Sequence, residues 1–367
     1  MTIKRESEIR VLTEYANRTG SQLLILYGEK GVGKTTLLNE FAREYTDVVH
    51  FDCSIVSERE QLYMWGNKMK TVLGELPEYP EFSDIFDALN RKNDSTAKRI
   101  LIFDEFQNIA KVSESFADYL FTHLQTSRKN VLIILCSSQV EWIENSMVRR
   151  FGIRAKNISG FLKIREFSFA DFVEEFPQFT LNECIDAYAI FGGFPSIWKL
   201  IDKKLSLEEN IIKQVCNPAN MLHHIGFWTV ESQLRETSVY NTILSALAQG
   251  KCKLNDLYQH TGFSRAKISV YLKNLTEMDC TEKLFSFDTA ETKSVQKGLY
   301  RIREPFLRFW YRFVLENNSI IVRGADDLTY KRIEPYFTDY MGKVFEDICT
   351  QYLWKQLLEE KCPVEFN

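Results

Sequence analysis

The segment Gly28-Glu29-Lys30-Gly31-Val32-Gly33-Lys34-Thr35 decides the fold of this chain. It matches the pattern G-x-x-x-x-G-K-[ST] at every fixed position. The apolar run at residues 23–27 precedes it and predicts a buried parallel strand, and residues 35–45 predict an amphipathic helix after it. A glycine-rich turn between such a strand and such a helix is the setting in which this pattern forms a phosphate-binding loop.

Each residue type in this loop has a physical task. Glycines let backbone N–H groups turn toward phosphate oxygens, and the N-terminus of the following helix adds partial positive charge. We expect the Lys34 ammonium to reach the β- and γ-phosphates and the Thr35 hydroxyl to bind Mg²⁺. The alternative is a glycine turn that opens an ordinary helix. The residues predicted to contact the nucleotide are Gly28, Glu29, Lys30, Gly31, Val32, Gly33, Lys34, Thr35 and Thr36.

An acidic pair follows a second apolar run. Residues 99–103 predict a strand, and Asp104 and Glu105 come directly after it, on the sheet edge where the glycine loop should lie. We predict that Asp104 holds Mg²⁺ through water together with Thr35, while Glu105 polarises the attacking water as general base. Lys34 completes the predicted catalytic set. Taken alone, the acidic pair would also fit a strand that runs into a solvated turn.

Strands and helices alternate through the first part of the chain. Further strands are predicted at residues 48–51, 131–136 and 161–164, and a helix at 116–126. Residues 57–92 are predicted to be mostly helical, with an interruption at Pro77 and Pro80. This alternation is typical of an α/β domain with a mostly parallel sheet. We therefore predict a P-loop NTPase domain over residues 1–165.

Two further groups near this domain's end are candidates for the site. Ser137-Ser138-Gln139 follows the strand at 131–136, and a polar residue there can hydrogen-bond the γ-phosphate or the attacking water, or simply end the strand. Arg149, Arg150 and Arg154 are candidates for an arginine finger, supplied in cis or by a neighbouring subunit. Exposed arginines are more often solvated.

The composition is that of an ordinary globular protein. Of 367 residues, 26% are charged, and the formal net charge is −4, so any basic surface must be local. The eight cysteines are scattered without a CxxC pair, which favours a reduced chain over a disulfide framework. No apolar signal core or long apolar run is present. We expect a cytoplasmic protein without a membrane partner.

The second part of the chain is mostly helical. Helices dominate residues 166–235, and residues 236–290 show helix-turn-helix spacing, with Gly262 in the turn and Ser264 as the N-cap of the last helix. That helix would bury Ile268, Leu272 and Leu275. Residues 291–367 are again helical, and their aromatic residues at helical spacing predict a core stripe rather than a base-stacking surface; these are Phe306, Phe309, Trp310 and Phe313.

The small helical domain offers a nucleic-acid surface. Arg265, Lys267 and Lys273 would lie on the exposed face of its last helix, where such side chains contact phosphates and base edges. Residues 238–287 carry six cations and four anions, so the local excess is only two charges. Domains of this type also mediate protein contacts and dimerisation. Double-stranded DNA, a protein partner and a second copy of the chain all remain candidate partners.

The chain resembles the archaeal-type ATPase family, a group of AAA+/STAND-like P-loop proteins, over nearly its whole length. Besides the glycine loop, the resemblance rests on Arg5, Glu6 and Glu8 and on four segments in family order. These are Phe103-Asp104-Glu105-Phe106-Gln107, Phe167-Ser168-Phe169-Ala170-Asp171-Phe172, Gly192-Gly193-Phe194-Pro195 and Glu304-Pro305-Phe306-Leu307-Arg308-Phe309-Trp310.

The resemblance implies an ATPase core, a helical lid over 166–235, a winged helix over 236–290 and a C-terminal domain similar to PD-(D/E)XK nucleases. The last of these begins within 291–367, where Gly342-Lys343-Val344-Phe345-Glu346 resembles its first helix. The strands that carry the nuclease residues are absent before Asn367. Nuclease activity is therefore not predicted, and the chain is interpreted as a truncated or naturally short form.

Together these observations predict a Mg²⁺-dependent ATPase whose nucleotide state controls the appended domains. ATP rather than GTP is implied by the resemblance and by the lack of an NKxD guanine signature. A kinase is less consistent with Asp104-Glu105 and the long helical regions. Two alternatives stay open, a nucleotide-gated regulator or scaffold with little turnover and a DNA-binding module with secondary ATPase activity.

Overall fold

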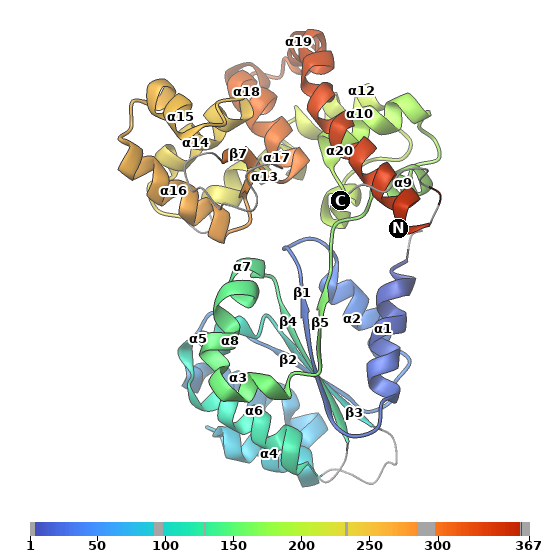
Figure 1. Cartoon of the computed structure of the whole chain (residues 1–367), viewed down its shortest axis with the longest axis vertical. Coiled ribbons are helices and arrows are strands. Elements are labelled where there is room, and N and C mark those ends of the chain that lie inside the picture. Colours follow the sequence, from blue (N-terminus) through green and yellow to red (C-terminus); the bar gives the residue numbers. More distant parts are fainter. Residues whose placement is uncertain are drawn as a thin grey trace. The chain divides into compact units, whose positions relative to one another are not determined.

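The computed structural model describes residues 4–91, 98–127, 130–231, 234–284, 298–359 and 361. The chain divides into two compact units, residues 4–165 and residues 166–367, which we call the N-terminal and the C-terminal unit (Figure 1).

The N-terminal unit is built on a five-stranded parallel sheet in the order β2-β3-β4-β1-β5. Its strands are β1 (Gln22–Tyr27), β2 (Val48–Asp52), β3 (Arg99–Asp104), β4 (Val131–Ser137) and β5 (Gly160–Lys163). Every residue of β4 is buried, as expected for a central strand covered on both faces. The predicted α/β class with a mostly parallel sheet is confirmed.

Helices cover both faces of this sheet. Figure 1 shows α1 (Glu6–Asn17) and α2 (Lys34–Ala42) on one face and α3 (Glu58–Leu73), α5 (Gln107–Val112) and α6 (Ser115–Thr126) on the other. The chain also forms α4 (Phe82–Arg91), α7 (Val140–Trp142), α8 (Val148–Phe151) and two short π- and 3₁₀-helices, η1 (Ile143–Met147) and η2 (Gly152–Asn157).

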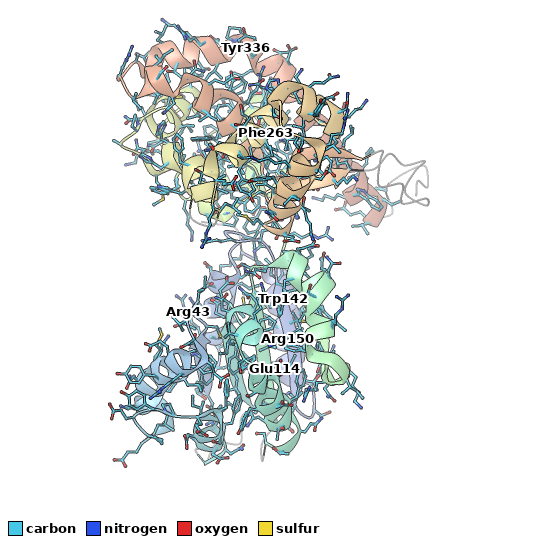
Figure 2. The ribbon with its side chains drawn as sticks, turned by 90° about the vertical axis from the view of Figure 1, so that its left-hand side faces the viewer. Arg43, Glu114, Trp142, Arg150, Phe263 and Tyr336 are labelled. Atoms are coloured by element: carbon cyan, nitrogen blue, oxygen red, sulfur yellow. The ribbon has the colours of Figure 1, made fainter. Side chains whose placement is uncertain are left out.

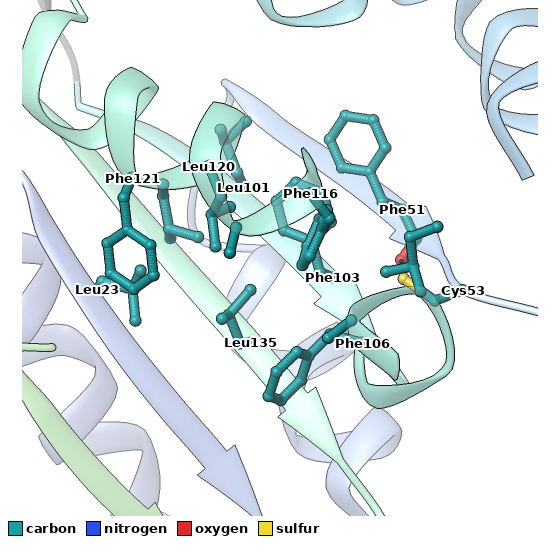
Figure 3. Packing of buried hydrophobic residues seen from close by; sticks show 14 of the residues in the cluster. Leu23, Phe51, Cys53, Leu101, Phe103, Phe106, Phe116, Leu120, Phe121 and Leu135 are labelled. Atoms are coloured by element: carbon teal, nitrogen blue, oxygen red, sulfur yellow. Dashed lines mark hydrogen bonds between the residues drawn. The ribbon is translucent and has the colours of Figure 1, made fainter. Parts of the chain in front are cut away.

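One core fills the space between the sheet and the helices of the second face (Figure 3). The Phe51 and Phe103 rings of neighbouring strands stack with centroids 4.5 Å apart, and Trp65 of α3 meets both rings edge-on. Fully burying a side chain of this size stabilises the fold by about 1.5–3 kcal/mol. This packing anchors β3, whose end carries the acidic pair.

Helix α2 is shorter than the sequence predicts. It ends at Ala42 rather than at residue 45, because the N–H groups of Arg43, Glu44 and Tyr45 bond three residues back, in a tightened last turn.

The C-terminal unit begins with short helices that enclose an aromatic core. They are α9 (Phe169–Glu175), α10 (Leu181–Phe191), α11 (Pro195–Trp198), α12 (Leu207–Asn210), η3 (Ile211–Val215) and α13 (Met221–Glu231). Phe167 N donates to Gly193 O at 2.8 Å, and a Cβ on Gly193 would lie 2.0 Å from Phe167 O. Only glycine permits this approach, which joins two segments that the sequence singled out.

The helix-turn-helix forms as predicted. It consists of α14 (Thr237–Ala248), α15 (Leu254–Thr261) and α16 (Arg265–Glu277), followed by the antiparallel strands β6 (Thr281–Leu284) and β7 (Leu299–Ile302). Gly262 has a φ of +70° in the turn, and Ser264 caps α16. Ile268, Leu272 and Leu275 are all buried. Residues 285–290 of the predicted winged helix lie outside the described residues.

The aromatic segment near residue 310 is a core stripe, as predicted, because Phe306, Phe309, Trp310 and Phe313 are all buried. Gly226 packs against Trp310 so closely that a Cβ there would lie 2.0 Å from the indole. The helices of this region are α17 (Pro305–Phe309), η5 (Trp310–Val314), α18 (Leu315–Ile321), α19 (Asp326–Ile333), η6 (Glu334–Tyr336) and α20 (Phe337–Leu358). Among the described residues, no helix has the length and apolar character needed to span a bilayer.

Candidate nucleotide-binding site

The glycine-rich loop lies between β1 and α2, as its pattern requires. Gly28 N donates to Ser137 O at 3.2 Å, and a Cβ on Gly28 would lie 2.1 Å from Ile164 O, so the loop starts where three strands crowd together. Gly31 and Gly33 have φ values of +92° and +94°, a conformation that side chains rarely allow. These turns precede the N-terminus of α2 and shape the loop as an anion cradle.

Lys34 is held across the loop. It is 5% exposed, and its Nζ donates to Gly28 O at 2.8 Å and to Glu29 O at 2.9 Å. The carbonyl oxygens lie within the same loop that should hold phosphates. A buried ammonium at this point adds positive charge to a site already lined by backbone dipoles.

The remaining predicted loop residues differ in exposure. Val32 is completely buried and Glu29 nearly so, whereas Lys30, Thr35 and Thr36 are exposed. Val32 therefore anchors the loop in the core, and the two threonines of α2 face outward at its start.

Thr35 and Asp104 come together although 69 residues separate them. Thr35 Oγ1 donates to Asp104 Oδ2 at 3.0 Å. Strand β3 places Asp104 at the same edge of the sheet as the end of β1, because parallel strands end on one side. A hydroxyl and a carboxylate at hydrogen-bond distance are the two oxygen donors that a P-loop NTPase offers to Mg²⁺.

The described residues contain no group of three His, Cys, Asp or Glu side chains that could hold a metal ion. Thr35 and Asp104 alone would therefore not make a closed protein cage. Mg²⁺ commonly keeps several waters and binds through one or two protein oxygens plus substrate phosphates, so the donor set fits such a site.

Glu105 adopts a left-handed backbone conformation with a φ of +54°. Its Oε2 accepts three hydrogen bonds, from Ser138 N at 3.1 Å, Ser138 Oγ at 2.6 Å and Gln107 Nε2 at 2.6 Å. Sparsely populated backbone conformations cost about 1–3 kcal/mol and cluster at functional sites. The surrounding side chains thus fix both the position and the orientation of this carboxylate.

Cys136 lies behind the acidic pair. Burial and the nearby Asp104 carboxylate, which its side chain also hydrogen-bonds, raise the pKa of the Cys136 thiol well above its usual value. Burial raises the pKa of the Cys53 thiol in the same way. Both thiols are therefore neutral, inert packing groups at neutral pH.

Arg5 belongs to this site, although sequence reasoning gave it no role. Its Nη2 donates to Val32 O at 2.8 Å and to Arg165 O at 2.7 Å, and its Nη1 pairs with Glu8 at 2.9 Å. The residue was singled out only through the family resemblance. A long-range side-chain contact to a backbone carbonyl leaves no local sequence pattern.

The three candidate arginine fingers have different surroundings. Arg150 donates to Ala110 O at 2.9 Å and lies 3.7 Å from Glu114 (Figure 2), and Arg154 pairs with Asp118. Arg149 is exposed on α8. Two of the three candidates are therefore engaged with the surface of their own unit.

The cations of α16 lie among aromatic rings. The Arg265 guanidinium stacks 4.3 Å from the Tyr258 ring centroid and bonds Asn255 at 2.5 Å. Lys267 Nζ lies 5.1 Å from the Phe263 ring centroid. These contacts fix the direction of two cations on an exposed helix, which favours phosphate recognition.

Nearby carboxylates reduce the positive charge of this surface. Glu236 Oε2 lies 3.9 Å from Lys267 Nζ and accepts a hydrogen bond from Tyr271. Lys273 lies 3.7 Å from Glu277 on the same helix. Of the three cations of α16, Lys267 and Lys273 each have a carboxylate within 4 Å, whereas Arg265 bonds the neutral Asn255.

Comparisons with known proteins agree with these features. Residues 3–201 match the model of an ATPase domain predominantly from Archaea, which confirms the resemblance inferred from the sequence. Residues 241–279 match the bacterial regulatory protein, arsR family, and residues 310–367 match archaeal and bacterial proteins of unknown function.

Individual proteins also match most or all of the chain. An uncharacterised protein of Methanocaldococcus jannaschii is 26% identical over all of this chain and 80% of its own length. A Walker-type ATPase of Pyrococcus abyssi has a similar structure, with a TM-score of 0.64 and 18% identity, over 84% of this chain and 95% of the other. The ORC2 protein of Aeropyrum pernix, solved as ADPNP-ADP complexes, gives a TM-score of 0.51 at 15% identity over 91% and 96%.

The two structural likenesses show a shared fold at low sequence identity, whereas the first family model covers more than half of the chain and includes the glycine loop and the acidic pair. The chain therefore belongs to the family of ATPase domains found predominantly in Archaea.

Proposed function

We propose that this protein binds and hydrolyses ATP with Mg²⁺ and that the nucleotide state controls its C-terminal domains. The observation that carries the proposal is the hydrogen bond between Thr35 and Asp104, beside the buried Lys34 and the clamped Glu105. Family membership supports ATPase chemistry. We infer a helical lid over 166–235, a winged helix over 236–290 and a C-terminal helical region over 291–367.

The loop residues would bind the nucleotide's phosphates. Backbone N–H groups of the glycine loop and of the first turn of α2, together with the Lys34 ammonium, would stabilise negative charge, which grows on the phosphoryl oxygens as the bond to the leaving group breaks. Thr35 and Asp104 would hold Mg²⁺, which when bound neutralises phosphate charge and orients the γ-phosphoryl group. Lys34 must then redirect its N–H groups from the loop carbonyls toward phosphate.

Glu105 would act as the general base. Three donors occupy its Oε2, so Oε1 is the carboxylate oxygen left to accept a proton from water. A positioned base of this kind contributes about 10²- to 10⁴-fold to the rate. The Ser138 and Gln107 contacts keep the carboxylate aimed in one direction, which lowers the entropic cost of reaching the transition state.

DNA is the partner that we propose for the winged helix. Arg265 and Lys267 present oriented cations at the start of α16. Lys273 lies further along the same helix. The match of residues 241–279 to a family of bacterial regulatory proteins supports a recognition role for this domain. ATP binding would then set whether this surface is available.

The first test is steady-state ATP turnover with Mg²⁺, measured with and without duplex DNA. Lys34→Ala should lose nucleotide binding, whereas Glu105→Gln should bind ATP normally and lower kcat by about 10²- to 10⁴-fold. Thr35→Ala should raise the Mg²⁺ concentration needed for half-maximal turnover. Wild type that binds ATP tightly without turnover, with or without DNA, would refute the hydrolase and favour a nucleotide-gated scaffold.

A further inference from the structure

The C-terminal unit contains a cavity of about 530 Å³ that the nucleotide site and α16 do not use. Segment η5 and helix α18 supply Arg312, Glu316 and Asn317, while α19 and η6 supply Lys331, Arg332 and Tyr336. Figure 2 labels Tyr336 in this unit. Two chain segments thus bring cationic side chains to one concave surface.

Charge in this cavity is one-sided. Three cations line it against the single carboxylate of Glu316, which already accepts a hydrogen bond from Gln249 at 2.7 Å and lies 3.9 Å from Arg312. Within the described part of the chain, no carboxylate forms an ion pair with Lys331 or Arg332. Placing like charges together costs Coulomb energy, and an anion would remove that cost.

The lining also points to the kind of anion. Arginine guanidinium groups match phosphate oxygens with two parallel hydrogen bonds, and the Lys331 ammonium adds a point charge. Tyr336 is 54% exposed and lines the same cavity as these cations. Phosphate contacts combined with an aromatic face are the chemistry that holds a nucleic-acid strand.

We propose that this cavity binds the phosphodiester backbone of a nucleic acid, with Tyr336 stacking on an adjacent unpaired base. Gln249 is the C-cap of α14, the first helix of the helix-turn-helix, and its bond to Glu316 links that domain to the cavity wall. The inference rests on the proposed DNA association and extends it to a second contact site on the same unit.

The test is fluorescence anisotropy of labelled duplex and single-stranded DNA over a salt series. Lys331→Ala/Arg332→Ala should weaken binding about tenfold or more and reduce the slope of log Kd against log salt by about 1–2, because two phosphate contacts are lost. Lys199→Ala/Lys204→Ala removes two exposed lysines elsewhere in this unit and should leave the slope nearly unchanged. Tyr336→Ala should weaken binding of the single strand about tenfold and of the duplex less.

Arg265→Ala/Lys267→Ala separates the two proposals. If this pair weakens DNA binding while the cavity variants match wild type, the cavity inference is wrong and the role of α16 stands. Wild type that binds neither duplex nor single strand overturns both. Pyrophosphate binding in the Lys34→Ala background, abolished by the cavity substitutions while DNA binding is kept, would assign the cavity to a small phosphorylated ligand and overturn the nucleic-acid assignment.

Discussion

Ser138 donates two hydrogen bonds to one carboxylate oxygen of Glu105. Its backbone N–H and its hydroxyl reach Glu105 Oε2 at 3.1 and 2.6 Å, and Gln107 adds a third donor to the same atom. The residue after β4 thus orients the residue after β3. This contact gives the polar turn at residues 137–139 a role that neither a γ-phosphate contact nor a plain strand end describes.

Ser138→Ala should lower kcat about tenfold or more while leaving ATP affinity within about twofold, because it loosens the base and not the phosphate cradle. Ser138→Thr keeps the hydroxyl and should restore most of the rate. Steady-state kinetics and ATP binding measured on both variants check this. A faster Ser138→Ala enzyme would show instead that the clamp restrains Glu105.

Gly28→Ala should destabilise the N-terminal unit. The added Cβ would lie 2.1 Å from Ile164 O, so β1 and β5 must separate or the loop must move. We expect a loss of at least about 1–3 kcal/mol in unfolding free energy, together with weakened ATP binding. Gly342→Ala is the control, since a Cβ there has no atom within 4 Å. Urea unfolding curves that coincide for wild type and Gly28→Ala would contradict the prediction.

Arg5→Ala should weaken ATP binding more than it changes kcat. Arg5 joins the Val32 carbonyl of the loop to the Arg165 carbonyl after β5, so its loss frees the loop without touching the acidic pair. We expect about a tenfold rise in the ATP dissociation constant, measured by titration calorimetry. Arg10→Ala, which removes an exposed arginine from α1, the helix that follows Arg5, is the matched control. Equal affinities of both variants would rule out this bracing role.

Glu236→Gln should strengthen DNA binding. It removes a carboxylate 3.9 Å from Lys267 while retaining an acceptor for Tyr271, whose pKa the hydrogen bond to Glu236 raises to about 12. Affinity should rise by severalfold at low salt and converge with wild type at high salt, because the effect is electrostatic. Glu14→Gln makes the same charge change on α1 of the N-terminal unit. If both variants gain the same DNA affinity, the effect comes from net charge alone.

Unfolding free energy should depend on pH through His123. Burial, with the nearby Arg99 cation, lowers the pKa of His123 from 6.5 to about 4. Between pH 6.5 and 4, His123 is therefore protonated in the unfolded chain but neutral in the folded chain. The unfolding free energy is highest above pH 6.5 and decreases as the pH falls toward 4. A shift of this size corresponds to about 3 kcal/mol.

In His123→Phe, the unfolding free energy measured with urea should depend less steeply on pH across that range. The substitution places an apolar ring beside Phe86, whose centroid lies 5.3 Å from that of the His123 imidazole. His260→Gln changes an exposed histidine and should keep the wild-type slope. An unchanged slope in His123→Phe would assign the acid sensitivity to other groups.

Local sequence determined the phosphate loop, the strands beside it and the helix-turn-helix. These elements follow from short-range rules: glycine at positive φ in Gly31 and Gly33, apolar runs for buried strands, and Ser264 as an N-cap. These rules did not predict where helix α2 ends, because its end depends on the tightened hydrogen bonds of its last turn. The placement of Asp104 beside Thr35 also followed, because parallel strands share one carboxyl edge.

Only the tertiary structure decided which distant side chains meet. The Ser138 clamp on Glu105 joins residues 33 positions apart, and the Arg5 brace on Val32 joins residues 27 positions apart. The bond from Gln249 to Glu316 at the cavity wall spans 67 positions. In the sequence each of these contacts corresponds only to single polar or cationic residues, with no local pattern that would predict their partners. Such contacts depend on strand order and helix packing, which arise from the whole core rather than from local propensity.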